Sequence, residues 1–206
     1  MTTRKNGAPT PKTDRTVAGE NWDGRDISGE THTRVGFVDL DLTEVVNTAA
    51  VFTDCTFQRA RFNVSKHQDA AFINCTFTAC SFFDTTFTEC KFVGSMFDRC
   101  TYELMRVVGG NWSFVGLSGA DLRKATFRAT RLREADLTGA KCQGASLRDV
   151  DLSGASLDGA NFTDSDLRGS DLSAVEPEHV VLTGAIITLN QAVVLITSMG
   201  LDVRAE

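Results

Sequence analysis

Cysteine, histidine and carboxylate side chains are the groups in this sequence that could carry chemistry. The six cysteines would suit a metal site or a redox pair, but none stands in a CxxC motif and none is grouped with histidine at the spacing of metal ligands. The sequence also contains no Ser–His–Asp set, no Walker-type phosphate loop and no paired-carboxylate motif. We therefore expect a protein without enzyme activity, without a metal and without a cofactor.

A period of five residues positions these side chains. Residues 75–100 read CTFTACSFFDTTFTECKFVGSMFDRC, with a phenylalanine at every number that ends in 2 or 7. The same register runs from 22 to 172, and its positions are large and apolar except for His32, Asn47, His67 and Cys142. Residues two places earlier are mostly small, and most glycines have numbers that end in 4 or 9, which suits a turn with positive φ. Neither the helix period of 3.6 nor the strand period of 2 accounts for this pattern.

The stretches ADLTG (135–139), ASLDG (155–159) and ANFTD (160–164) resemble the A(D/N)LxG repeat of the pentapeptide-repeat family. The resemblance implies an all-β fold, a right-handed quadrilateral β-helix. Each five-residue unit would form one side, four units would form a coil, and residues 20 apart would stack. The large and small positions would then fill a narrow core. Stacked strands lie about 4.8 Å apart, so nearly eight coils would make a rod of roughly 37 Å.

In this fold five of the cysteines occupy the small inward position, and Cys142 occupies a central one. We expect buried, reduced thiols, because buried cysteine behaves as a small apolar residue. Cys55 with Cys75, and Cys80 with Cys100, would stack in adjacent coils, close enough for a disulfide.

The histidines are expected to be structural. Asn47 and His67 would stack on one side of the rod and could hydrogen-bond as a buried polar step. The alternative is a functional dent in that side. His32 also has a core position, so neither histidine is expected to act as a general base, and His179 has no nucleophile beside it.

The periodicity divides the chain into three segments. Residues 1–20 have two prolines and no periodicity, and we expect a disordered tail. Residues 21–187 form the predicted β-helix. In 188–206 apolar residues recur at helical spacing and Gly200 ends the helix, which predicts a C-terminal helix and tail. One face of that helix carries five apolar residues: Leu189, Ala192, Val193, Ile196 and Met199.

The net charge of −6 argues against direct nucleic-acid binding. The sequence has neither a signal peptide nor an apolar run long enough to cross a membrane, so we expect a cytoplasmic protein. A rod studded with carboxylates could imitate the regular negative charge of duplex DNA, although any acidic soluble protein has surface acids. A basic ladder of Arg128, Arg148 and Arg168 would make such mimicry patchy. The acids expected in vertical register form three pairs: Asp69 with Glu89, Asp151 with Asp171, and Asp158 with Glu178.

The uninterrupted repeats and the ending LTGAIITLNQAVVLITSMGLDV resemble the MfpA and Qnr group. Proteins of that group bind type II topoisomerases, DNA gyrase and topoisomerase IV, and protect them from quinolones and other poisons. The resemblance implies a homodimer formed through the C-terminal helix, with the acidic pairs as the partner-binding surface. The resulting hypothesis is a DNA-mimicking rod that protects a topoisomerase and can inhibit supercoiling. The alternative is a β-helical scaffold with another partner, in which the arginine ladder binds an anionic group.

Overall fold

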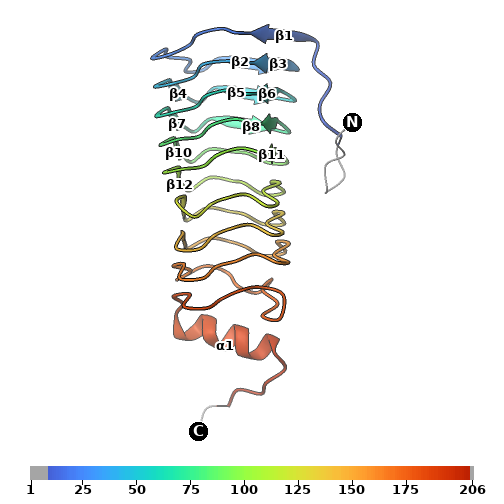
Figure 1. The fold of residues 1–206 in the computed structure, drawn as a ribbon, viewed down its shortest axis with the longest axis vertical. Coiled ribbons are helices and arrows are strands. Elements are labelled where there is room, and N and C mark those ends of the chain that lie inside the picture. The colour runs from blue at the N-terminus through green and yellow to red at the C-terminus, as the bar shows by residue number, and fades with distance from the viewer. Residues whose placement is uncertain (1–8, 205–206) are drawn as a thin grey trace.

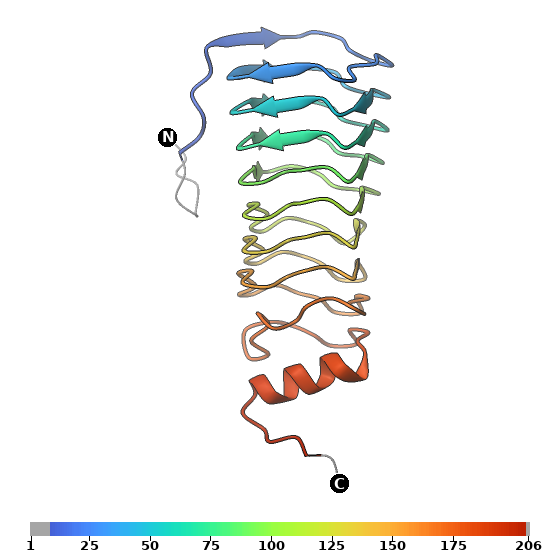
Figure 2. The same cartoon turned by 180° about the vertical axis from the view of Figure 1, so that it is seen from behind.

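The computed structural model describes residues 9–204, which form a rod of stacked coils with one helix at its C-terminal end (Figure 1, Figure 2). The strands pair in parallel with residues 20 apart, as in the register Phe57↔Phe77. The predicted fold class, a quadrilateral β-helix followed by a short α-helix, is confirmed.

Three sides of the rod contain strands that continue from coil to coil as parallel sheets, and isolated bridges extend the stacking toward the C-terminus. The β9 side consists of β1 (Arg15–Ala18), β3 (Val35–Val38), β6 (Thr56–Gln58), β9 (Thr76–Thr78) and β11 (Met96–Asp98). The β10 side consists of β4 (Val46–Thr48), β7 (Lys66–Gln68), β10 (Thr86–Thr88), β12 (Arg106–Val108), β13 (Thr126–Arg128) and β14 (Ser146–Arg148). The β8 side consists of β2 (Thr31–Thr33), β5 (Val51–Thr53) and β8 (Ala71–Ile73).

The fourth side, here called the bridge side, is joined by isolated parallel bridges such as Asp41↔Arg61. Between sides the chain turns at a corner residue whose number ends in 4 or 9. Most corner residues have positive φ whether they are glycine, as Gly119 (φ 68°), or not, as Asp39 (φ 54°). A residue without Cβ, or with a short polar side chain, adopts this conformation at the lowest cost, which explains the five-residue spacing of glycine.

The core is a set of ring ladders that run along the rod axis. Phe57 and Phe77 stack with ring centroids 4.9 Å apart, and Phe77 stacks on Phe97 at 4.7 Å. Neighbouring ladders meet edge to face, as Phe72 and Phe77 do at 5.9 Å. Both arrangements are favourable for aromatic rings, so the ladders account for the phenylalanine period.

The cysteines follow the same inward positions and form no disulfide. Five of the six are buried, and Cys100 is half-buried. The thiols of the five cysteines at small inward positions donate to backbone carbonyls of the preceding coil, as Cys75 Sγ does to Phe52 O at 3.4 Å.

The predicted polar step at Asn47 and His67 is confirmed. Asn47 Oδ1 accepts from the Ala50 N–H, so its Nδ2 faces His67 Nδ1 and donates to it at 2.9 Å. His67 Nε2 therefore carries the proton and donates to Ser65 Oγ at 2.9 Å, and Ser65 Oγ donates to Phe62 O. Every polar atom of this step has a partner, as buried polar groups require.

This step makes the stability of the rod depend on pH, because burial lowers the pKa of His67 to about 3. Between that value and the ordinary 6.5, the unfolded chain binds a proton that the folded chain does not, so stability falls as pH falls. We expect the lowered pKa of His67 to reduce the free energy of unfolding by about 2 kcal/mol when the pH falls from 7 to 5. Urea unfolding of wild type and His67→Phe at both values measures it: the variant is less stable throughout but loses about 2 kcal/mol less on acidification. Equal losses would contradict a neutral His67.

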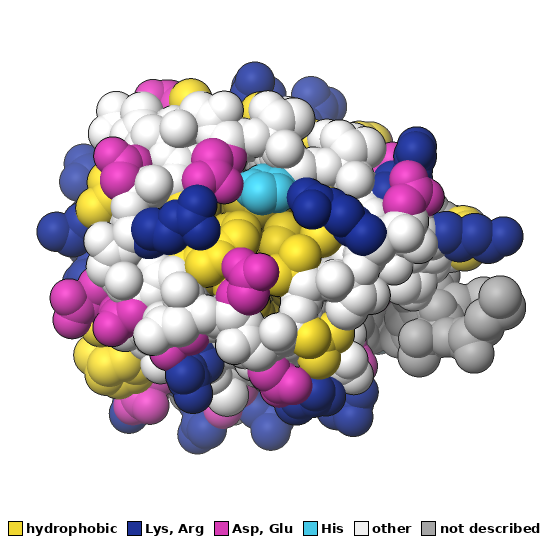
Figure 3. Space-filling model, turned by 90° about the horizontal axis from the view of Figure 1, so that it is seen from above, with side chains coloured by type: hydrophobic (Ala, Val, Ile, Leu, Met, Phe, Trp, Pro, Cys, Tyr) yellow, Lys and Arg dark blue, Asp and Glu magenta, His cyan; other side chains and the backbone are white. Residues whose placement is uncertain are grey.

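Charged side chains close the N-terminal end of the core. Figure 3 shows apolar side chains at the centre of this end, with basic and acidic side chains around them. The Arg25 guanidinium lies 4.9 Å from the Trp22 ring centroid, and Glu30 pairs with both Arg25 and His32 at 3.0 Å. His32 itself stacks on Phe52 at 4.9 Å, which agrees with its core position in the sequence register.

The expected disordered tail at 1–20 is wrong for residues 15–18, because they form β1 and pair with β3 in the register Val17↔Phe37. The β-helix thus begins before the predicted boundary at residue 21. The part of that tail at 1–8 lies outside the described residues. At the other end, α1 (Leu189–Ser198) begins one residue after Thr188, which caps it together with Gln191.

Candidate functional site

Several acids on the rod pair with a basic residue of a neighbouring coil. Arg59 lies 2.6 Å from Asp39, and Arg61 lies 2.5 Å from Asp41. The hydrogen bond from Arg61 lowers the pKa of Asp41 to about 2. Because both pairs join residues 20 apart, the stacking itself creates them, and it neutralises the acids at these positions.

One edge of the rod carries a row of carboxylates, most of which have no such partner in the described residues. Asp69, Glu89 and Asp149 are the corner residues that follow β7, β10 and β14, and none forms an ion pair within residues 9–204. Asp151 and Asp171 bridge to one another at the start of the β8 side, next to this corner. We call these five residues the acidic edge. Two of the three predicted acidic pairs therefore lie together on it.

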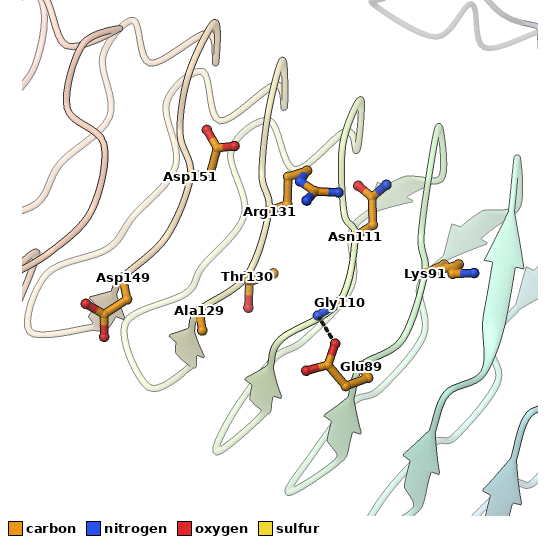
Figure 4. A pocket seen from close by; sticks show the side chains of 9 residues that line it. All are labelled: Glu89, Lys91, Gly110, Asn111, Ala129, Thr130, Arg131, Asp149 and Asp151. Atoms are coloured by element: carbon orange, nitrogen blue, oxygen red, sulfur yellow. Dashed lines mark hydrogen bonds between the residues drawn. The ribbon is translucent and has the colours of Figure 1, made fainter.

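A groove of about 390 Å³ lies between Glu89 of the first pair and Asp151 of the second (Figure 4). Asp149 and Asp151 lie at one end of it, and Glu89 and Lys91 lie at the other. Arg131 projects between them, so the groove is acidic at its ends with two cations along it. Asp151 also approaches Arg133 at 3.8 Å.

The floor of the groove is hollow because its residues are small. Gly109 and Gly110 both have positive φ, and Ala129 lies in the next coil. Glu89 folds over Gly109 and accepts a hydrogen bond from the Gly110 N–H at 3.0 Å, which holds the carboxylate at the rim. Sequence reasoning missed this hollow, although Gly110 occupies an inward position that elsewhere has a small side chain rather than none.

The third predicted pair, Asp158 and Glu178, lies elsewhere and is not brought together as expected. The Gly139 N–H donates to Asp158 O, but one coil later the Gly159 N–H donates to His179 O, one residue beyond the regular register. The turn around Pro177 causes this slip. As a result His179 Nδ1, rather than a second carboxylate, lies 3.5 Å from Asp158.

The arginine ladder also stacks, with Arg128 paired to Arg148 across β13 and β14. Arg168 binds Asp166 at 2.7 Å and, by this hydrogen bond, lowers the pKa of that carboxyl to about 2. Arg148 reaches the same carboxylate only at 3.8 Å. Arg128 forms no ion pair in the described part of the chain, so the first two steps of the ladder keep most of their positive charge.

The C-terminal helix packs on the last coils through one polar anchor. Gln191 Nε2 donates to Leu167 O and Ser170 O at 2.7 Å, and Leu195 is buried beside it. The face predicted as an interface points away from the rod. Its exposed fractions are 82% for Leu189, 40% for Val193, 38% for Ile196 and 61% for Met199, whereas Ala192 is half-buried.

Between residues 9 and 204 no group of three or more histidine, cysteine or acidic side chains is arranged so that it could hold a metal ion. No helix in the same residues is long and apolar enough to cross a membrane.

Comparison with known proteins agrees with the repeat pattern. The family model described as pentapeptide repeats matches residues 117–154 and 135–173. The matched residues 117–173 form regular coils of the rod, so the family model and the fold agree on pentapeptide repeats in this part of the chain. A comparison with curated protein sequences found no match.

Solved structures similar to the rod include two trypsin-treated variants of QnrB1, which is described as a plasmid-mediated fluoroquinolone resistance protein. The first has a TM-score of 0.77 at 21% identity, and the second has 0.76 at 22%. Each alignment covers 94% of this chain and 97% of the other. The chain thus shares the fold of QnrB1 over nearly its whole length.

Proposed function

We propose that this protein is a non-enzymatic, cytoplasmic rod that binds DNA gyrase or topoisomerase IV and protects it from fluoroquinolones or other poisons. The observation that carries the proposal is the acidic edge, where Asp69, Glu89, Asp149 and Asp171 lie along one edge of the rod and form no ion pair in the described part of the chain. The shared fold with QnrB1, a fluoroquinolone resistance protein, supports the choice of partner. The protein makes and breaks no bond itself.

The acidic edge can compete with DNA for a basic surface of the enzyme. From Asp69 to Asp171 it spans five coils, or roughly 24 Å, which is about seven base pairs of duplex. The proposed mimicry uses this one edge because its carboxylates are aligned along the rod axis, whereas acids such as Asp39 and Asp41 are paired with an arginine of the next coil.

Purified protein titrated into gyrase tests the proposal, with supercoiling and fluoroquinolone-induced DNA cleavage as readouts. Wild type should reduce cleavage near stoichiometric concentration. The double variant Asp149→Asn/Asp151→Asn should bind about tenfold more weakly, since each exposed charge contributes up to about 1 kcal/mol. Asp23→Asn on the bridge side, an exposed acid without an ion pair, is the matched control and should change neither readout. Unchanged cleavage with wild type would overturn the protective role.

We further propose that two copies join through α1. Its outward face exposes Leu189, Val193 and Ile196, and an apolar surface of this kind is unfavourable in water unless a partner covers it. A dimer joined at the helices would double the length of the rod.

Ile196→Asp should therefore give a monomer in sedimentation at concentrations where wild type is a dimer. The aspartate would carry charge into the apolar contact, where it has no partner. Val194→Asp is the matched control, because Val194 is also exposed (43%) but lies on the flank of the helix. A dimer that survives Ile196→Asp would place the interface elsewhere.

A second candidate function is a scaffold whose arginine ladder binds an anionic group on a different partner. This second function is favoured because Arg128 forms no ion pair in the described part of the chain and Arg148 approaches a carboxylate only at 3.8 Å. The two candidates are separated by comparing gyrase binding of Arg148→Ala and Asp149→Asn/Asp151→Asn. If Arg148→Ala loses gyrase binding and Asp149→Asn/Asp151→Asn retains it, the scaffold function is favoured.

A further inference from the structure

Two corner residues of the rod have side chains that suit neither their backbone nor their exposure. Val64 and Leu104 have φ of 60° and 59°, in the left-handed region that glycine and asparagine adopt most readily. A β-branched or bulky side chain there is strained. Both are also exposed, Val64 by 39% and Leu104 by 44%.

An exposed phenylalanine lies on the coil between them. Phe83 departs from the five-residue register, points outward and is 42% exposed. The Val64 N–H donates to Phe83 O at 2.8 Å, so the Val64 corner rests directly on Phe83. Asp84 is the corner residue between Val64 and Leu104, which places the three apolar side chains within about 10 Å along the rod. We call Val64, Phe83 and Leu104 the edge patch.

Charged groups surround the edge patch. Arg106 reaches across the corner to Asp84 at 2.8 Å. One coil toward the N-terminus, Glu44 is an exposed corner residue and forms no ion pair in the described part of the chain. The surface therefore offers an apolar contact with one free carboxylate beside it, which complements an apolar side chain next to a basic one.

The edge patch is also placed to act together with the acidic edge. Glu89 is the next corner after Asp84, and the two corners bound the same side of the rod, the β10 side. A partner that lies across the β10 side would contact both edges at once.

We propose that the edge patch is a protein-contact surface that receives an apolar side chain flanked by a basic residue. Resting on the proposed function, the partner is the type II topoisomerase that the acidic edge binds. The strained and exposed apolar corner residues lower the stability of the isolated rod. When the partner covers them, the burial of their apolar side chains stabilises the complex.

The test combines two readouts on purified protein, the melting temperature and the affinity for gyrase. In Val64→Asn/Leu104→Asn, asparagine fits the left-handed corners, so Tm should rise by about 2–5 °C. The same variant should bind gyrase at least about tenfold more weakly, because it removes two of the three apolar contacts. Phe83→Ser should weaken binding similarly without changing either corner.

Phe114→Asn is the matched control. Phe114 is a left-handed corner residue (φ 60°) that is 48% exposed, but it lies ten residues from Leu104, half a coil away on the opposite edge. Its replacement should raise Tm and leave gyrase affinity unchanged. If wild type binds gyrase and the edge-patch variants bind equally well, the inference is overturned and the proposed function stands. If wild type does not bind gyrase, the proposed function fails, and the inference that rests on it fails as well.

Discussion

Replacing Phe87 by alanine is expected to lower the free energy of unfolding by about 3–5 kcal/mol. Phe87 is 1% exposed, stacks on His67 with centroids 4.9 Å apart and meets the edge of Phe92 at 5.0 Å. The hydrogen bonds between coils fix the spacing of the surrounding backbone, as β10 pairs with β7 and β12. The walls of the cavity therefore cannot close, and the loss should lie at the upper end for such substitutions.

Phe83→Ala is the control for this prediction. Phe83 is only four residues away but is exposed and outside the core register, so its loss should change stability by no more than about 0.5 kcal/mol. Urea unfolding of the two variants measures the contrast. A mild effect of Phe87→Ala, equal to that of Phe83→Ala, would mean that the ring ladder contributes little to stability.

The ladder was predictable because the five-residue period dictates which side chains point inward. The same rule of 20-residue stacking predicted the contact of Asn47 with His67 and the pairing of Arg128 with Arg148. It works because each coil binds the next through its backbone, so a register present in the sequence is preserved in space.

The charge pattern was only partly predictable. Counting acids suggested columns of negative charge, but the stacking that aligns acids also aligns arginines with them, as in Asp39 and Arg59. Both residues are 20 apart, so the rule contained this information. What it could not contain is the slipped turn around Pro177, which puts His179 beside Asp158 in place of Glu178.

The start of the rod was missed for a different reason. The segment 15–18 is short and largely exposed, and only its Val17 follows the five-residue pattern of apolar positions. Its strand is formed by pairing with β3 and not by a pattern of its own. A first coil that is open on one side needs fewer apolar residues, so its sequence resembles a tail.

The groove depends on one glycine, and this leads to the second large prediction. Gly110→Ala should lower the free energy of unfolding by at least about 3 kcal/mol. A Cβ at Gly110 would lie 2.1 Å from Cys90 O, and the backbone there has φ of 80°. Since Cys90 O also accepts the Asn111 N–H at 3.0 Å, the backbone of the preceding coil cannot move away without losing a hydrogen bond.

Substitutions at two other glycines distinguish the effect of backbone strain at positive φ from that of a steric clash of the added Cβ. Gly139 has φ of 65° and nothing within 4 Å of an added Cβ, so Gly139→Ala should cost only about 1 kcal/mol, the strain alone. At Gly109 the added Cβ would meet the Glu89 carboxylate, which can swing aside. Gly109→Ala should thus resemble Gly139→Ala in stability but weaken topoisomerase binding by displacing a carboxylate of the acidic edge. Equal free energies of unfolding for Gly110→Ala and Gly139→Ala would show that the backbone at Cys90 can shift to accommodate the added Cβ. In that case the hollow is a consequence of small side chains and not of a backbone that only glycine allows.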